Sequence, residues 1–181
     1  MKKISQKVKD NLVLKKMFDE DTFQLSNPDK FGENVQDINE KRRRKLWKII
    51  DSGKIKTGVD YYRASMILQH VGYGIIEDTK KAIELAKKSM ELKYELGRWM
   101  YAYTLDRWLI FTGKKQKFGT QYEIISSKKK TVSSVQKQYF RLCDYNKKTT
   151  DSLRARYNVL SLKRLKADAK EMTNNFLNRK S

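Results

Sequence analysis

The chain contains few residues that interrupt a helix. Among its 181 residues, proline occurs once, at Pro28, and glycine occurs eight times. Proline removes a backbone donor and glycine favours turns, so their scarcity leaves most of the chain free to be helical. This feature predicts a mainly α protein.

Apolar side chains at helical spacing place the individual helices. The expected helices cover residues 35–51, 60–70, 77–92 and 96–111, and a weaker pattern covers 3–18. The polar stretch 19–34, which contains Pro28, is expected to be a connector. We therefore expect residues 1–34 to form an N-terminal basic segment with its connector, and residues 35–181 to form a single helical domain.

The last third of the chain shows a different pattern. Aromatic and branched residues cluster in 122–125 and 136–145, which predicts a small β-hairpin near 122–145. From about Ser161 onward, one apolar stripe predicts an amphipathic helix that packs on the helical core. The members of this stripe are Leu162, Leu165, Ala169, Met172 and Phe176. The predicted fold is a helical bundle with a C-terminal β-hairpin.

Composition excludes several classes of protein. The single cysteine, Cys143, excludes a disulfide framework, and the single histidine, His70, excludes a multi-histidine metal centre. No apolar run approaches the roughly 20 residues of a membrane helix, and the basic N-terminus lacks the apolar segment of a secretory signal. We expect no metal, no cofactor and no membrane span. The expected setting is intracellular, in the cytoplasm, or a virion if the chain is viral.

The charge of the chain favours an anionic partner. Lys and Arg number 41 against 21 Asp and Glu, a formal net charge of +20. Half of this excess lies in residues 123–181, where Lys128, Lys129 and Lys130 fall between the two expected strands. Such an excess attracts nucleic acid or another polyanion, and an acidic protein partner would also fit. The alternative is a lysine-rich surface that serves solubility alone.

Two stretches of sequence carry resemblances. In residues 61–102, a G-Y-G-I turn is followed by Asp78 and then by an A-x-x-x-A helix. This stretch resembles one Sel1-type repeat, a relative of the tetratricopeptide helix pair, although Met100 stands where the repeat has a small residue. Solenoids need about three units. The resemblance therefore implies one Sel1-like helical hairpin inside another fold.

The longer resemblance runs from Asp37 to about Asn174. It rests on DYYRASMILQH at 60–70, RWMYAYTLDRWL at 98–109, GKKQKFGTQY at 113–122 and TTDSLRARYNVLSL at 149–162. These stretches are similar to a family of uncharacterised domains, mostly bacterial, which usually shows Q-K-Y-G-T-Q where this chain has Phe118. The resemblance implies an architecture and a candidate site with the QH, DR and QKFGTQ residues, and no assigned reaction.

Three charged or ionisable residues of these stretches allow two interpretations. His70 ends a predicted helix, where it either meets the negative end of the helix dipole or serves as a general base or ligand contact. Asp106 and Arg107 lie in an aromatic helix and either form a structural ion pair or act on a ligand, with Asp106 orienting His70 and Arg107 holding an anion.

The loop after this helix supplies two amides, a hydroxyl and a glycine: Gln116, Gly119, Thr120 and Gln121. It either caps neighbouring helices or contacts a ligand. We expect His70, Asp106, Arg107 and this loop to converge in one polar pocket. The predicted function is the binding of an anionic ligand or partner there. The alternatives are a hydrolase or transferase that uses the same pocket, and a structural nucleic-acid-associated or virion protein that acts by charge.

Overall fold

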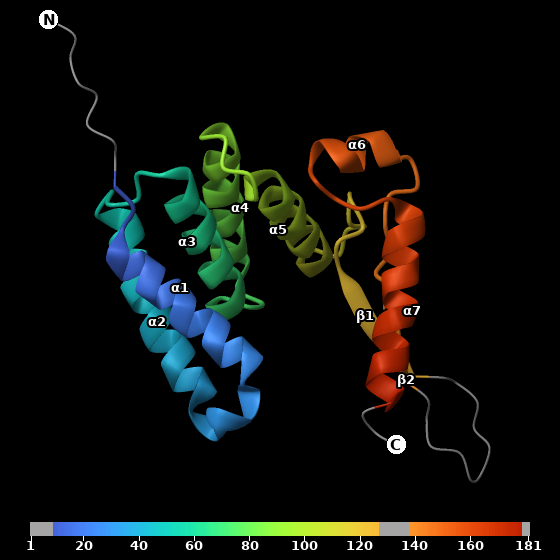
Figure 1. The fold of residues 1–181 in the computed structure, drawn as a ribbon, viewed down its shortest axis with the longest axis horizontal. Helices are drawn as coiled ribbons and strands as arrows, with labels where there is room; N and C mark the ends of the chain where they lie inside the picture. The colour runs from blue at the N-terminus through green and yellow to red at the C-terminus, as the bar shows by residue number, and fades with distance from the viewer. Residues whose placement is uncertain (1–8, 127–137, 179–181) are drawn as a thin grey trace, which may run out of the picture. The chain divides into compact units, whose positions relative to one another are not determined.

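The computed structural model describes residues 9–126 and 138–178, and it confirms a mainly helical fold with a two-stranded antiparallel hairpin (Figure 1). The elements are α1 (Leu12–Ser26), η1 (Pro28–Lys30), η2 (Gly32–Asn34), α2 (Val35–Asp51), α3 (Gly58–Val71), α4 (Ile76–Glu91), α5 (Gly97–Phe111), β1 (Tyr122–Ser126), β2 (Gln138–Leu142), α6 (Asp151–Arg156) and α7 (Leu162–Asn178). They group into two compact units, Met1–Thr104 and Leu105–Ser181. The boundary falls within α5.

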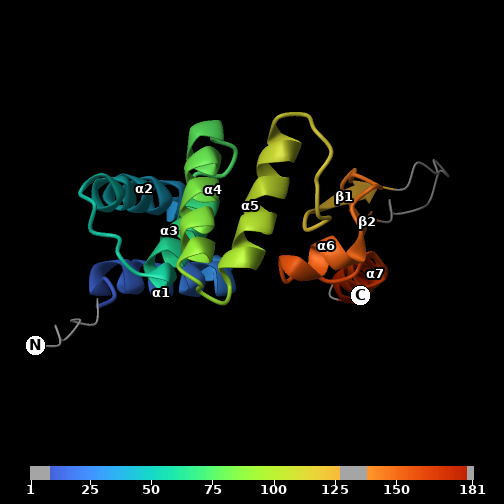
Figure 2. The ribbon, with the colours of Figure 1, turned by 90° about the horizontal axis from the view of Figure 1, so that it is seen from above.

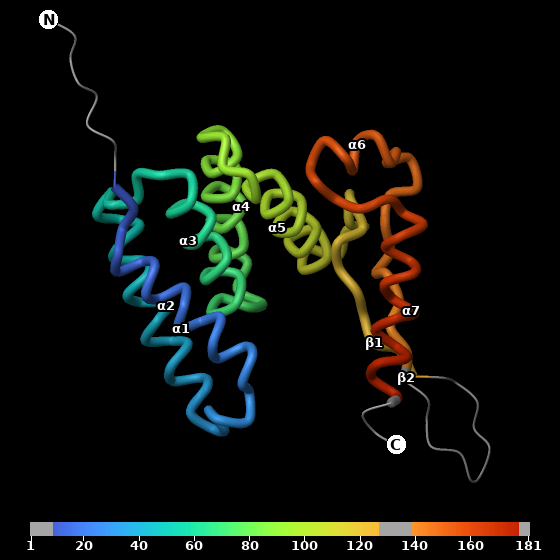
Figure 3. The backbone as a smooth tube through the Cα atoms, viewed as in Figure 1, coloured from blue at the N-terminus to red at the C-terminus, as the bar shows by residue number. Residues whose placement is uncertain are grey.

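The N-terminal unit is built from two helical hairpins. Figure 3 shows α1 running one way and α2 returning beside it, and α3 and α4 form a second, closely packed pair. The core between these helices contains Leu14, Leu46, Ile67 and Leu68, which are all fully buried. The four predicted helices from residue 35 to residue 111 are confirmed to within about two residues at each end. The Sel1-like character of the α3–α4 pair stays a prediction.

The expected connector at 19–34 is wrong over its first half. Helix α1 begins after Asn11, whose side chain accepts from the Leu14 backbone N–H, and it continues to Ser26. Its buried side chains are Leu14, Met17, Asp21 and Gln24, which follow one another at 3-4-3 spacing. The last two of these four side chains are polar, so the apolar pattern in the sequence ends after Met17 although the buried face of the helix continues to Gln24. Residues 1–34 thus include a helix that supplies part of the core.

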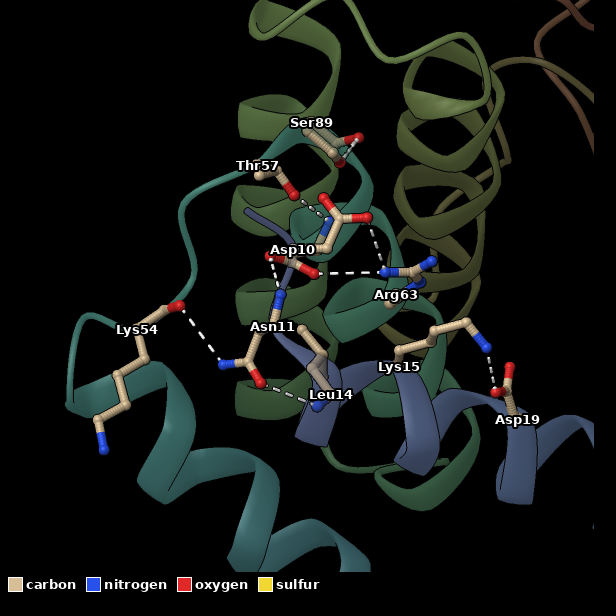
Figure 4. A network of polar contacts seen from close by, with 11 residues as sticks. Asp10, Asn11, Leu14, Lys15, Asp19, Lys54, Thr57, Arg63 and Ser89 are labelled. Carbon is tan, nitrogen blue, oxygen red and sulfur yellow. Dashed lines mark hydrogen bonds and ion pairs between the residues drawn. The ribbon is translucent and has the colours of Figure 1, made fainter. Parts of the chain in front are cut away.

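A polar network fastens the start of α1 to α3 (Figure 4). The backbone N–H of Asn11 donates to the buried carboxylate of Asp60 at 2.9 Å, and the Asn11 side chain reaches the Lys54 carbonyl. Arg63 lies between the carboxylates of Asp10 and Asp60, 3.4 Å from each. Because Asp60 accepts from a backbone 49 positions away, burial of this charge fixes where α1 enters the fold.

A second buried carboxylate joins α2 to α4. Asp78 accepts from two guanidinium nitrogens of Arg43 and from the Trp47 indole at 3.1 Å. The hydrogen bond and the charge of Asp78 raise the pKa of Arg43. The backbone of Gly72 passes so close to Asp78 that a Cβ there would overlap the carboxylate. The N-cap of α4 is Ile75, and Asp78 lies in the first turn of the helix, where a negative charge is favourable.

The C-terminal unit places α7 alongside the hairpin, as Figures 1 and 2 both show. β1 and β2 pair antiparallel with Ile124 opposite Phe140, and the Phe140 ring meets Phe176 edge to face with 5.8 Å between centroids. On the expected stripe of α7, Leu165 and Ala169 are buried, whereas Met172 is 36% exposed. The stripe packs on β2, and not on a helical core as predicted.

The sequence patterns missed one short helix, α6. Its N-cap is Thr150, whose hydroxyl accepts from the Leu153 N–H. The carboxylate of Asp151 accepts from the Leu162 N–H at the start of α7, and this bond, with help from Arg154, lowers the pKa of Asp151. With six residues, α6 is too short for a periodic apolar pattern.

We predict that Leu165→Ala lowers the free energy of unfolding by about 2–5 kcal/mol, because a buried leucine leaves a cavity against the hairpin. Leu177→Ala is the control in the same helix, since Leu177 is 38% exposed, and it should cost less than about 1 kcal/mol. Urea unfolding followed by circular dichroism measures both. Equal costs would contradict burial of the Leu165 side chain in the C-terminal unit.

We predict that the Tyr122 phenol makes the protein lose stability in strong base. Burial, with a smaller effect of Asp168, raises its pKa from 10.0 to about 12. Above about pH 10 the unfolded chain loses this proton before the folded chain does, so rising pH favours unfolding until about pH 12. Tyr122→Phe should flatten the fall of the urea midpoint over this range, and parallel curves for the two proteins would contradict the prediction.

Candidate functional site

The QKFGTQ loop, residues 116–121, folds around the carboxylate of Asp106. The four backbone N–H groups of residues 117–120 donate to its two oxygens at 2.6–3.1 Å, and the Thr120 hydroxyl donates at 2.9 Å. Asp106 is fully buried in α5. A buried carboxylate is very costly without donors, and this loop supplies them from consecutive residues. Of the polar side chains expected to contact a ligand, Thr120 thus bonds to this buried charge.

A buried guanidinium contacts the same loop. Arg154 of α6 is 1% exposed, and its Nε donates to the Phe118 carbonyl at 2.8 Å. That carbonyl belongs to the same peptide group as the Gly119 N–H, which donates to Asp106 at 2.9 Å. One peptide therefore joins the buried cation to the buried anion. Each charge polarises the peptide in the direction that strengthens the other hydrogen bond.

Gln116 closes the loop and attaches it to the chain after β2. Its fully buried amide accepts from the Gln121 N–H at 2.9 Å and donates to the carbonyls of Gln121 and Cys143 at 3.0 and 2.8 Å. Its backbone N–H donates to the Asp144 carbonyl, and its carbonyl accepts from the Asn146 N–H. Both ends of this residue thus hold residues 114–117 beside residues 144–146.

Two further predicted residues complete the cluster. Arg107 donates through Nε to the Gln121 side chain at 3.3 Å. Gly119 has a φ of +91°, a backbone conformation that favours glycine. The structure thus brings together six of the seven predicted ligand-binding residues: Asp106, Arg107, Gln116, Gly119, Thr120 and Gln121. Their role in ligand binding stays a prediction.

His70 has a different carboxylate partner from the one expected. Its Nδ1 lies 2.5 Å from Asp21 of α1, and the other Asp21 oxygen accepts from Arg42 of α2 at 3.1 Å. The same Arg42 nitrogen also contacts the side-chain oxygens of Gln24 and Asn39. The expected pairing of His70 with Asp106 is corrected accordingly, because Asp21 orients the ring within the N-terminal unit. A pocket that His70 shares with the Asp106 loop stays a prediction.

Exposed lysines gather on the two segments that Gln116 joins. Lys114, Lys115 and Lys117 flank Gln116, and Lys147 and Lys148 follow Tyr145, which forms a parallel bridge with Gln116. We call these five residues the lysine patch. None of them has an acidic partner among the described residues, and Asp144, in the same segment, forms no ion pair with them.

Partly exposed aromatic rings accompany the lysine patch. The ammonium of Lys114 lies 5.4 Å from the centre of the Trp108 ring. Lys166 of α7 lies 6.0 Å from the centre of the Tyr145 ring, which sits at the bridge itself. Proteins that bind single-stranded nucleic acid combine cations, which meet the phosphates, with aromatic faces, on which the bases stack.

Other chemical possibilities find less support. Burial and the nearby Glu123 raise the pKa of the Cys143 thiol, so it stays protonated and weakly nucleophilic at neutral pH. Within residues 9–126 and 138–178, no three His, Cys, Asp or Glu side chains gather to hold a metal ion. In the same ranges, no helix combines the length and apolar character needed to cross a membrane. The predicted anion contacts Lys128, Lys129 and Lys130 lie outside the described residues.

Sequence reasoning missed Arg154, Asp21 and the lysine patch. Arg154 lies within the TTDSLRARYNVLSL stretch, but a single arginine there gives no sign of burial. Asp21 could have been found from its 3-4-3 spacing with Leu14 and Met17. The lysine patch depends on a backbone bridge between residues 29 positions apart, for which local pattern gives no signal.

Comparison with known proteins gave no match to a family model, to a curated protein or to a solved structure.

We predict that Asp106→Asn lowers the free energy of unfolding by about 3 kcal/mol or more. The amide would turn a donor toward the backbone N–H groups, and the Phe118–Gly119 peptide that Arg154 contacts would lose its anionic acceptor. Asp144→Asn, at an exposed position of the same unit, should cost less than about 0.5 kcal/mol. Urea unfolding measures both. Unchanged stability together with lost ligand binding would instead make Asp106 a binding residue.

Proposed function

We propose that this protein binds single-stranded nucleic acid through the lysine patch of its C-terminal unit, without sequence preference. The observation that carries the proposal is that five exposed lysines from two separate segments lie together with no acidic partner among the described residues. Lysines are point charges, and those that form no ion pair are available to phosphates.

The distribution of acidic residues supports this proposal. Burial removes four carboxylates from the described surface, those of Asp21, Asp60, Asp78 and Asp106, and only two guanidiniums, those of Arg42 and Arg154. The surface is therefore more positive than the net charge of +20 suggests. Helical lysines such as Lys15 and Lys16 lie beside acids, whereas those of the lysine patch do not. A polyanion is thus attracted more strongly to the lysine patch than to the helical lysines that have acidic partners.

The rings of Trp108 and Tyr145 favour nucleic acid over an anionic membrane or an acidic protein. Bases stack on aromatic faces while phosphates meet the neighbouring ammonium groups. Backbone bonds hold Gln116, which lies within the first lysine segment, to the second segment, so the backbone of the patch is ordered before a partner arrives. Little ordering entropy is then lost on binding.

We predict that Lys147→Gln with Lys148→Gln weakens binding of a single-stranded oligonucleotide of about 20 nucleotides, and that the slope of log K against log salt falls by about 1.4. Lys15→Gln with Lys16→Gln is the matched control, because it removes the same charge from an adjacent pair that has acidic partners. This control should leave the affinity nearly unchanged. Fluorescence anisotropy over a salt series measures both quantities.

Two outcomes would contradict the proposal. Equal weakening by the two double variants would mean that net charge alone drives binding. Binding to vesicles that contain phosphatidylserine, dependent on Lys147 and Lys148, with no binding of the oligonucleotide, would make an anionic membrane the partner.

A further inference from the structure

A cavity of about 400 Å³ lies in the N-terminal unit, and none of its lining residues belongs to the lysine patch or to the Asp106 loop. Its apolar lining includes Ile55 and Leu85, which are buried members of the core, and Leu92 at the end of α4. Its cationic lining is Lys56, Lys81 and Lys88. The volume falls in the range of small-molecule sites, which are mostly apolar with a few charged groups.

The helix α4 alternates the two kinds of side chain along one face. Lys81, Leu85, Lys88 and Leu92 all line the cavity and follow one another at four-, three- and four-residue spacing. The two lysines are therefore separated by about 10 Å along the helix axis, with a leucine between them. A ligand that lies along this face meets apolar surface and positive charge together.

The positive charge of the cavity is only partly paired with acidic side chains. Lys81 pairs with Glu84 at 2.9 Å and Lys88 with Glu91 at 3.5 Å, both on the exposed surface of α4. Neither glutamate lines the cavity, so a ligand carboxylate inside it competes with Glu84 and Glu91 for these two lysines. Lys56 has no acidic partner among the described residues, and no acidic side chain of the described chain lines the cavity. The lining is thus complementary to an anion with an apolar body.

We propose that this cavity binds a small amphipathic carboxylate, with its hydrocarbon body on Ile55 and Leu85 and its carboxylate among Lys56, Lys81 and Lys88. Burial of the hydrocarbon on a rigid core surface supplies the driving force, and the lysines select the sign of the head group. The proposal shares no residue with the nucleic-acid surface, so either can fail alone.

The test is isothermal titration calorimetry with decanoate and with decylamine, which carry similar chains and opposite charges. The wild-type protein should bind decanoate more tightly than decylamine. Lys81→Gln with Lys88→Gln should lower the affinity for decanoate by at least about fivefold. Lys80→Gln with Lys87→Gln is the matched control, because these exposed lysines precede the cavity pair by one residue and do not line it. This control should retain wild-type affinity.

A second variant reverses the charge selection. Leu92→Glu changes a side chain that is 45% exposed, so the fold should tolerate it, and it brings a carboxylate to the cavity. Decanoate should then bind more weakly and decylamine more tightly, with an unchanged thermal midpoint. Equal effects of the two lysine pairs, equal binding of the two ligands by the wild type, or displacement of decanoate by the oligonucleotide would each overturn the proposal.

Discussion

The structure depends on aspartates that are buried where separate segments meet. Asp21, Asp60, Asp78 and Asp106 are at most 1% exposed, and each accepts bonds from a segment other than its own helix. Removing a carboxylate from water costs several kcal/mol, so its donors must be in place when the fold closes. Each aspartate therefore fixes an arrangement of the chain: Asp60 the entry of α1, Asp78 the contact of α2 with α4, and Asp106 the course of the loop after α5.

The burial of these aspartates also makes the charge of the surface more positive. A chain with few carboxylates that buries four of them leaves lysines facing water with few opposite charges nearby. The burial of aspartates and the positive charge of the surface thus have the same cause. The exposed lysines repel one another, and this repulsion lowers the stability of the folded state. The buried ionic networks oppose this loss of stability. Both proposed binding regions depend on exposed lysines. In the C-terminal unit the lysines lie beside aromatic rings, and in the N-terminal unit they line a cavity with apolar side chains.

Local regularity could be predicted from the sequence, and long-range polar pairing could not. Helices α2 to α5 and the hairpin were predicted because their apolar spacing is a property of neighbouring residues. Helix α1 was misplaced because Asp21 and Gln24 occupy its buried face, where an apolar pattern expects leucine. Asp106, Arg107 and the QKFGTQ loop were correctly grouped, since few residues separate them. One of the two interpretations had Asp106 orient His70, and the structure pairs His70 with Asp21 instead. Helical spacing could place Asp21 on the buried face of α1, but it gives no information on a partner 49 positions away.

The buried charge in the C-terminal unit and the proposed function are physically connected. Asp106 holds the backbone of residues 117–120, and this fixes the position of Gln116 at the start of the loop. Gln116 then bonds to the segment that continues into Lys147 and Lys148. The lysines on the two segments repel one another, and the hydrogen bonds of Gln116 to Cys143, Asp144 and Asn146 hold the segments together against this repulsion. A fully buried carboxylate thereby holds in place the loop from which part of the lysine patch projects, and such preorganisation lowers the entropic cost of the polyanion binding proposed above.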